Sequence, residues 1–400
     1  MSKRKILCGV CGIGMGHTLR QQPIIDHLAR DSTLVIFAYG DSYRHFQSRY
    51  RAEPHVHVVQ VSVPFYMGGA EGLDFTRTAT RPGNFAEDTL AINCNAMARA
   101  QAVLGRPDLV VSDYEPVAAQ YAYATAAPLV TIDQQSKYLV GEFPSLLHGQ
   151  GFADEVQRLR MFFPKAEARF ACSFFKVTQQ SGKRGEKVTI VPPVLSDAVL
   201  GMRRDRGATR RDARDILVYV SSQREFSLTA IQVARILASQ PRWRFHVFVP
   251  GAAMPEEAAL ATLPGNVNVH RTGDASFYEV LQKCAGIVTT AGHSLLSEAM
   301  YLRKPVYALP LPVYEQQMNA HVIDVNGFGI GRPHLTEPQL AEFLGGLPDF
   351  AANIRNDKAV LLHGSGDQRI IRQLERKLAC VPSSADRSAQ APALRLQQQR

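Results

Sequence analysis

Two series of alternating strand and helix signals constrain the fold of this chain more than any other feature. In the first half, apolar runs such as KILCGVC (5–11), TLVIFAY (33–39) and DLVVS (108–112) alternate with amphipathic stretches such as TLRQQPIIDHLAR (18–30). After residue 214 the alternation starts again with DILVYV, RFHVFV, GIVTT and PVYALP. Strands that alternate with helices form parallel sheets covered by helices on both faces. The sequence therefore predicts an α/β protein with two doubly wound, Rossmann-like domains.

The length of 400 residues fits two such domains of about 150–200 residues each. The stretch VTIVPPVLSD (188–197), with its paired prolines, and the Arg-rich run after it indicate an interdomain linker. The last twenty residues have no core-forming pattern and are expected to be disordered. The predicted boundaries are 1–195 for the N-terminal domain, 196–214 for the linker, 215–380 for the C-terminal domain and 381–400 for the tail.

The net charge of +9 favours an anionic partner: a nucleotide diphosphate, an acidic membrane surface or nucleic acid. Six arginines between 203 and 214 contribute to it, either as a solvated linker or as a contact with phosphate or membrane. No aromatic-rich basic stripe indicates a nucleic-acid module, although nucleic acid stays open as an acceptor. No stretch has the roughly 20 consecutive apolar residues that a bilayer span requires. The basic N-terminus runs into a Gly-rich turn, which predicts a first strand rather than a signal peptide.

The six cysteines are scattered along the chain, and the lone C-x-x-C formed by Cys8 and Cys11 has no partner pair at zinc spacing. Strand residues three apart point to opposite faces, so joint ligation of a metal is not expected. We therefore expect reduced thiols and a cytoplasmic protein, with peripheral contact at the inner membrane face as a second option.

The first candidate site is the turn GIGMGH at 12–17, directly after the first strand. Gly12, Gly14 and Gly16 permit a tight turn and close backbone approach at the start of a helix. A dinucleotide fingerprint would require glycine where His17 stands and an acidic residue at the end of the second strand, so an oxidoreductase is disfavoured. A histidine presented by such a turn is suited to act as a general base.

The second candidate is Asp113, which follows another strand in DLVVSDYEP. The carboxyl ends of parallel strands meet at one edge of the sheet, so Asp113 could pair with His17 and fix its tautomer. Alternatively, Asp113 could simply cap the next helix. Asp113 and Glu115 form the nearest approach to a D-x-D metal motif, and without a further carboxylate cluster this indication of a metal is weak.

Two segments of the second half form a third candidate site. In 289–305, Gly292 and Ser294 lie between a strand and a helix, where backbone N–H groups and the helix dipole attract an anion. Glu298 follows one turn later and could accept hydrogen bonds from a ribose. In 310–320, Glu315 and Gln316 are suited to bind sugar hydroxyls.

Together with GIGMGH, DLVVSDYEP and VYVSS (218–222), these segments resemble the signature of UDP-sugar-dependent GT-B glycosyltransferases. They are similar to the glucuronosyltransferase and plant-glycosyltransferase group and to the N-acetylglucosaminyltransferase that makes the peptidoglycan lipid intermediate. The segment starting at VSDYEP also resembles an uncharacterised prokaryotic branch. The resemblance covers most of residues 5–330 and implies two Rossmann-like domains that face each other across a cleft.

The resemblance implies an acceptor-binding N-terminal domain with His17 as catalytic base and Asp113 as its supporting carboxylate. At three places the sequence differs from the pattern of these families. Thr290 stands where many members have His, Glu315 stands where Asp is frequent, and Ser221 and Ser222 replace a more glycine-rich loop. The implied donor-binding residues of the two domains are Gly14, Ser221, Ser222, Thr290, Gly292, His293, Ser294, Glu298, Glu315 and Gln316.

The resulting expectation is an inverting, metal-independent transfer of a hexosyl-type sugar from a nucleotide-diphosphate donor to a hydroxyl acceptor, without a further cofactor. The segment 64–84 is expected to line the acceptor site. Its mixture of aromatics, Thr and Arg suits several acceptors, with an envelope or lipid-linked precursor first. Two alternatives stay open: a nucleotide-sugar epimerase of the same fold, and a nucleotide-sugar-binding protein without catalysis.

Overall fold

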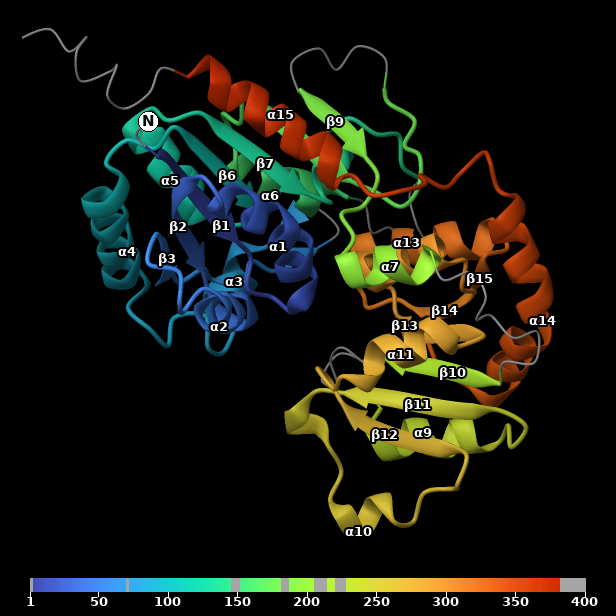
Figure 1. The fold of residues 1–400 in the computed structure, drawn as a ribbon. Coiled ribbons are helices and arrows are strands. Elements are labelled where there is room, and N and C mark those ends of the chain that lie inside the picture. Colours follow the sequence, from blue (N-terminus) through green and yellow to red (C-terminus); the bar gives the residue numbers. More distant parts are fainter. Residues whose placement is uncertain are drawn as a thin grey trace, which may run out of the picture.

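The computed structural model describes residues 3–69, 72–144, 152–180, 187–204, 214–219 and 228–381. The chain forms two α/β domains that lie next to each other, each built on a parallel sheet (Figure 1). The predicted fold class is therefore confirmed. Ser221 and Ser222, the residues 205–213 of the Arg-rich run and the tail from 382 onward lie outside the described residues.

Within the described residues, the first sheet has seven parallel strands in the order β3-β2-β1-β6-β7-β8-β9. Successive residues around β1 point to opposite faces: Cys8 packs in one hydrophobic cluster and Leu7 and Cys11 in another. The strands are β1 (Arg4–Val10), β2 (Ser32–Ala38), β3 (Val56–Gln60), β6 (Leu109–Asp113), β7 (Leu129–Asp133), β8 (Ala168–Cys172) and β9 (Val188–Val191).

Helices cover both faces of this sheet, as expected for a doubly wound domain. The apolar residues of α1 and α2 pack in the cluster on one face, and those of α4, α5 and α6 in the cluster on the other. The helices of this domain are α1 (Met15–Ala29), α2 (Gly40–Arg49), α3 (Phe75–Thr80), α4 (Thr89–Leu104), α5 (Pro116–Thr125) and α6 (Ala153–Phe162), with the 3-10 turn η1 (Ser136–Leu139).

In the described part of the second domain, six parallel strands form a sheet in the order β12-β11-β10-β13-β14-β15. Helices α11, α12 and α13 cover one face, and α9 and α14 the other. The strands are β10 (Asp215–Tyr219), β11 (Arg244–Val249), β12 (Val267–Arg271), β13 (Gly286–Thr290), β14 (Val306–Leu309) and β15 (Gly329–Gly331). The helices are α7 (Asp197–Arg204), α9 (Ala230–Ala238), α10 (Glu257–Leu260), α11 (Ser276–Lys283), α12 (His293–Leu302), α13 (Tyr314–Val325) and α14 (Glu337–Asn356), with the 3-10 turn η2 (Gly251–Ala253).

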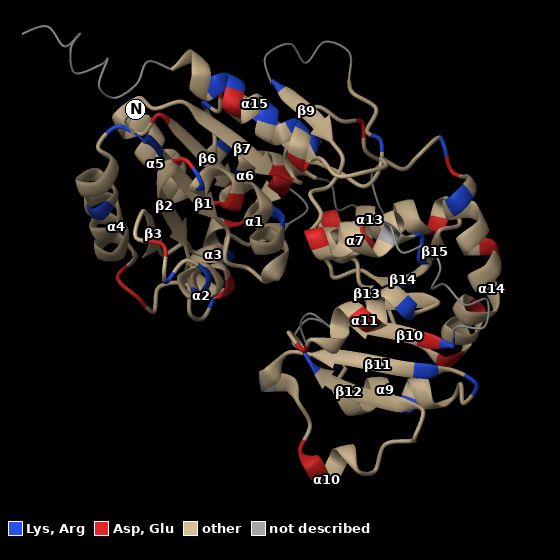
Figure 2. Ribbon diagram, viewed as in Figure 1, with Lys and Arg blue, Asp and Glu red and all other residues tan. Residues whose placement is uncertain are grey.

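The last helix, α15 (Asp367–Cys380), returns to the first domain and lies along its sheet (Figure 1). Ile370, Leu374 and Leu378 are buried in the same cluster as Ile24 and Leu28 of α1. Charged residues are frequent along α15 (Figure 2), and Arg369, Arg372, Glu375 and Arg376 are exposed. The sequence-based division assigns this helix to the C-terminal domain, whereas its apolar face completes the core of the N-terminal domain.

Two segments contain strands that the sequence did not predict. The stretch 188–197 was expected to be a linker, but residues 188–191 form β9 and extend the first sheet. Within 64–84, the short strands β4 (Gly68–Gly69) and β5 (Gly72–Leu73) pair, and α3 follows. In the described part of the chain, no helix is long and apolar enough to span a membrane.

The domains share one hydrophobic cluster across their boundary. Tyr138, Phe174 and Phe175 of the first domain pack with residues of the second, among them Leu296 of α12 and Tyr314 of α13. The ring of Tyr138 lies 5.6 Å from that of Tyr314, and the Tyr314 hydroxyl donates to the carbonyl of Pro144 at 2.7 Å. The two domains therefore contact each other directly beside the ends of their central strands.

Candidate active site

The turn after β1 presents His17 on the first turn of α1. Gly14 caps this helix at φ 68° and ψ −179°, a backbone conformation that only glycine adopts without strain. A Cβ on Gly16 would lie 2.8 Å from the Ser294 hydroxyl of the second domain. The glycines of this turn thus fix the start of α1 and let it approach α12.

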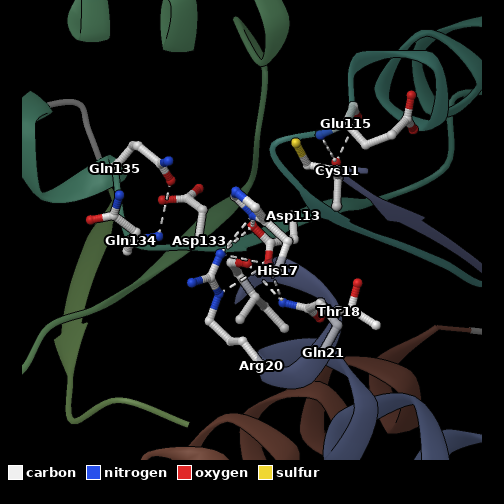
Figure 3. A network of polar contacts seen from close by, with 12 residues as sticks. Cys11, His17, Thr18, Arg20, Gln21, Asp113, Glu115, Asp133, Gln134 and Gln135 are labelled. Atoms are coloured by element: carbon white, nitrogen blue, oxygen red, sulfur yellow. Dashed lines mark hydrogen bonds and ion pairs between the residues drawn. The ribbon is translucent and has the colours of Figure 1, made fainter. Parts of the chain in front are cut away.

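His17 and Asp113 are brought together as predicted: Nδ1 of His17 lies 2.8 Å from Oδ1 of Asp113 (Figure 3). The Asp113 side chain is fully buried and accepts further hydrogen bonds. Arg20 donates from Nε to Oδ2 at 2.9 Å and from Nη2 to Oδ1 at 2.8 Å, and Gln21 donates to Oδ2 at 3.1 Å. Asp113 is therefore held rigidly in its ionised form beside the imidazole.

Nδ1 of His17 has two neighbours that compete for it. Besides Asp113, Nη2 of Arg20 lies 2.8 Å away and can only donate. If Nδ1 carries the proton and donates to Asp113, the Nε2 lone pair is free to act as a base. If Nδ1 instead accepts from Arg20, the neutral ring carries its proton on Nε2 and has no basic atom to offer a substrate.

Asp113 and the histidine shift each other's proton affinity. Burial opposes ionisation of Asp113, but Arg20 and His17 outweigh it and hold the pKa of this carboxyl below its ordinary value. Burial likewise opposes the charged imidazole, but Cys11 and Asp113 outweigh it, and the pKa of His17 is raised. A raised pKa makes His17 a stronger base, which must first lose its own proton.

Glu115 and Tyr114, next to Asp113, serve other purposes. Glu115 caps α5 by accepting from the backbone N–H groups of Val117 and Ala118 at 2.7 and 2.8 Å. The alternative that Asp113 caps this helix is therefore wrong, and Glu115 is not directed toward a shared metal. Tyr114 has φ 57°, and its ring stacks on that of His17 with centroids 6.2 Å apart. Among the described residues, no group of three or more His, Cys, Asp and Glu side chains could hold a metal ion.

The start of α12 carries the residues predicted to bind the diphosphate and ribose. Gly292 precedes the helix, and the space beside its Cα is open. His293 is buried, its Nε2 has no partner among the described residues, and burial together with Lys137 lowers its pKa well below the usual value. Glu298 is also buried, and burial raises its pKa to about 7. Its carboxyl group makes no hydrogen bond or ion pair to any described residue.

The other residues predicted to bind the sugar donor differ in how far their side chains already take part in hydrogen bonds within the protein. Glu315 lies on the first turn of α13 and accepts from Asn319 at 3.3 Å. Gln316 uses its side-chain oxygen to accept from the backbone N–H of Leu311 at 3.0 Å, so it braces the preceding loop. Thr290 is buried at the end of β13.

Sequence reasoning missed Arg20 and Gln21, which complete the surroundings of Asp113. They could have been found, because residues 17, 20 and 21 share one face of a helix. It also missed Lys137, which is fully buried with its ammonium 2.8 Å from the Gln134 side-chain oxygen. Burial lowers the pKa of Lys137 to about 8.

A small pocket between α1 and α12 connects the two halves of the candidate site. Arg20 and Leu19 line it from the first domain, and His293, Ser294 and Glu298 from the second. The catalytic pair predicted from the N-terminal domain therefore lies close to the donor residues predicted from the C-terminal domain.

Solved structures with this architecture align over nearly the whole chain. A UDP-glucosyltransferase from Polygonum tinctorium has a TM-score of 0.61 at 13% identity, and the alignment covers 94% of this chain and 99% of that one. LpCGTa, solved in complex with UDP, has a TM-score of 0.59 at 14% identity, with coverage of 95% and 100%. The two facing parallel-sheet domains define a GT-B glycosyltransferase fold.

The family is shown by the sequence itself. The family model described as Glycosyl transferase family 1 matches residues 4–348, and the chain belongs to this family. An uncharacterized glycosyltransferase of Methanopyrus kandleri is 28% identical over 126 residues. That match covers 28% of this chain and 36% of the relative, so it spans about a third of the curated relative's length.

Proposed function

We propose that this protein is an inverting glycosyltransferase that moves a sugar from a nucleotide-diphosphate donor, a UDP-sugar, to a hydroxyl acceptor. The observation that carries the proposal is the 2.8 Å contact of His17 with the buried Asp113 at the start of α1, directly opposite the start of α12. The glycosyltransferases of like fold, one of them named as a UDP-glucosyltransferase and one bound to UDP, support UDP as the nucleotide.

In the proposed reaction, Nε2 of His17 takes the proton of the acceptor hydroxyl while that oxygen attacks the anomeric carbon. The bond between the anomeric carbon and the donor phosphate oxygen breaks, and its electron pair leaves with the diphosphate. Asp113 holds the Nδ1–H and stabilises the imidazolium that forms. The backbone N–H groups and dipole at the start of α12, near Gly292 and Ser294, stabilise the leaving group without a metal ion.

Glu298 is proposed to bind the ribose and Glu315 the sugar hydroxyls. The acceptor is proposed to lie on the far side of His17, where Tyr66, Tyr114 and Phe162 pack edge to face. Buried Glu155 and half-buried Arg158 lie beside them, with the Tyr114 hydroxyl donating to Glu155 at 2.9 Å. Aromatic walls with a few polar groups suit an acceptor that has both an apolar body and a hydroxyl, and a lipid-linked or other envelope precursor has this character.

The test is a panel of nucleotide sugars incubated with cell extract, with free nucleotide measured and products identified by mass spectrometry. We expect release of UDP together with a glycosylated product in the presence of EDTA. His17→Ala should reduce transfer by about 10²–10⁴-fold while UDP affinity by calorimetry stays nearly unchanged. An epimerised donor without glycosylated product would support the epimerase alternative. UDP binding without any turnover would support the binding protein, and loss of activity restored only by a divalent metal would overturn the metal-independent mechanism.

A further inference from the structure

Arg20 has hydrogen-bonding capacity that its contact with Asp113 does not use. The residue is 4% exposed, and its Nε and Nη2 both face the Asp113 carboxylate. Because a guanidinium is planar, engaging this edge leaves Nη1 on the opposite side, as Figure 3 shows. No hydrogen bond of Nη1 to any described residue is found. Nη1 therefore keeps its N–H donors for a ligand in the pocket that Arg20 lines.

The surroundings of Arg20 indicate what this ligand is. Arg20 follows Gly16 by one helical turn, and Gly16 is the residue of α1 that approaches the hydroxyl of Ser294. Among the described residues, Arg20 is the only Lys or Arg that lines the pocket between α1 and α12. The other side of the pocket is formed by α12, with Ser294 on its first turn and Glu298 on its second. A cation and a helix N-terminus that face the same small space both attract an anion.

We propose that Nη1 of Arg20 binds the diphosphate of the nucleotide donor while Nε and Nη2 hold Asp113. This inference rests on the proposed function and adds a donor-binding residue from the N-terminal domain. One guanidinium then contacts both the partner of the catalytic base and the leaving group. When the glycosidic bond to the diphosphate breaks, the negative charge that develops lies next to Nη1, where it is stabilised.

The binding has a second consequence for His17. A diphosphate that draws the guanidinium toward α12 weakens the contact of Nη2 with Nδ1 of His17, which is 2.8 Å in the free protein. Nδ1 is then free to donate to Asp113, and the Nε2 lone pair becomes available. The base would thus gain its active tautomer when the donor is bound.

Calorimetry with UDP and with uridine tests the proposal, because only UDP carries the diphosphate. Arg20→Gln should weaken UDP binding by about 10- to 100-fold, the range for a lost charge-assisted hydrogen bond. Uridine affinity should not change. Gln21→Met is the matched control: Gln21 is buried beside Arg20 and also donates to Asp113, but it does not line the pocket. This variant should bind UDP as the wild type does.

Arg20→Gln leaves Asp113 with a buried charge and could fail to fold, so a second pair of variants removes that charge. Asp113→Asn keeps Arg20 and should bind UDP at least as tightly as the wild type. Asp113→Asn combined with Arg20→Gln should bind UDP about 10- to 100-fold more weakly than Asp113→Asn alone. Equal UDP affinity of these two variants would overturn the role of Arg20 and leave the proposed function standing. A wild-type protein that binds no UDP would instead overturn the UDP donor itself, and with it this inference.

Discussion

At the scale of single residues, the proposed role of His17 as general base predicts how transfer depends on pH. Against the effect of burial, Cys11 and Asp113 together raise the pKa of His17, and a general base acts only after losing its proton. Transfer should therefore increase with pH through the pKa of His17, above the ordinary value of about 6.5. In Asp113→Asn the carboxylate charge is lost, so the pKa falls and the rising limb moves to lower pH.

The measurement is kcat/KM against pH for both proteins. The plateau of Asp113→Asn should lie below that of the wild type and above that of His17→Ala, because the imidazole remains but has lost its charged partner. A rising limb that stays in place or moves to higher pH in Asp113→Asn would contradict the assigned pairing.

If Glu298 binds the ribose, as we propose, nucleotide binding should be coupled to the loss of a proton from this residue. Burial raises its pKa to about 7, so close to neutral pH much of this group is protonated in the free protein. Ribose hydroxyls that donate to the carboxylate favour its charged form and lower the pKa. UDP binding near pH 7 should therefore release a fraction of a proton.

Calorimetry in two buffers of different ionisation enthalpy measures this release. Glu298→Gln should abolish it and weaken binding by roughly 1–3 kcal/mol. Proton release that persists in Glu298→Gln would assign the titration to another group.

Sequence reasoning predicted those residues of the candidate site that lie at the end of a strand or shortly after one. His17, Asp113 and Glu298 come directly after strands or on the next helical turn, and the rule that ligands bind at the carboxyl edge of a parallel sheet identifies them. Arg20 and Lys137 were missed because polar residues on an amphipathic helix or in a turn are usually solvated. Their burial depends on the second domain and on neighbouring loops, which local patterns do not encode.

At the scale of the elements, the approach of α1 to α12 depends on the absence of a side chain at residue 16. In Gly16→Ala the new Cβ would lie 2.8 Å from the Ser294 hydroxyl and force it to move. If that hydroxyl binds the diphosphate, Gly16→Ala should weaken UDP binding about as much as Ser294→Ala does.

A double-mutant cycle tests this coupling. In the Ser294→Ala background, Gly16→Ala should have little further effect on UDP affinity, since the displaced group is already gone. Losses that simply add would mean that Gly16→Ala acts by another route, such as a shift of the whole helix.

Helix and strand positions were predicted best where the pattern is long and regular. The sequence pattern predicts helices at 116–125, 276–283 and 85–104. The first two match α5 and α11, whereas the third begins only at Thr89, after the cap Asp88. The strand β9 was read as linker because it has four residues, three of them half-exposed, and is followed by two prolines. An edge strand of this kind has neither the length nor the hydrophobicity of a central one.

At the scale of the whole molecule, the return of α15 makes the stability of the first domain depend on the end of the chain. Leu374 is fully buried against α1 and the first sheet. Leu374→Ala should lower the free energy of unfolding by about 2–5 kcal/mol. The matched control is Arg376→Ala, an exposed change on the same helix, which should have little effect.

Hydrogen exchange shows which domain responds. In Leu374→Ala, exchange should accelerate in peptides from β1 and α1 and stay nearly unchanged in β10 and β13. Equal acceleration in both domains would show that they unfold as one unit.

The position of α15 also dictates an order of events during synthesis. The ribosome releases the N-terminal half first, but the apolar face of α1 with Ile24, Ile25 and Leu28 lacks part of its cover until Leu378 has emerged. A nascent chain therefore carries an incomplete first domain through the translation of the entire second one. Exposed apolar surface of this kind is what chaperones bind. Completion of the N-terminal domain is thus tied to the synthesis of residues that follow the entire second domain.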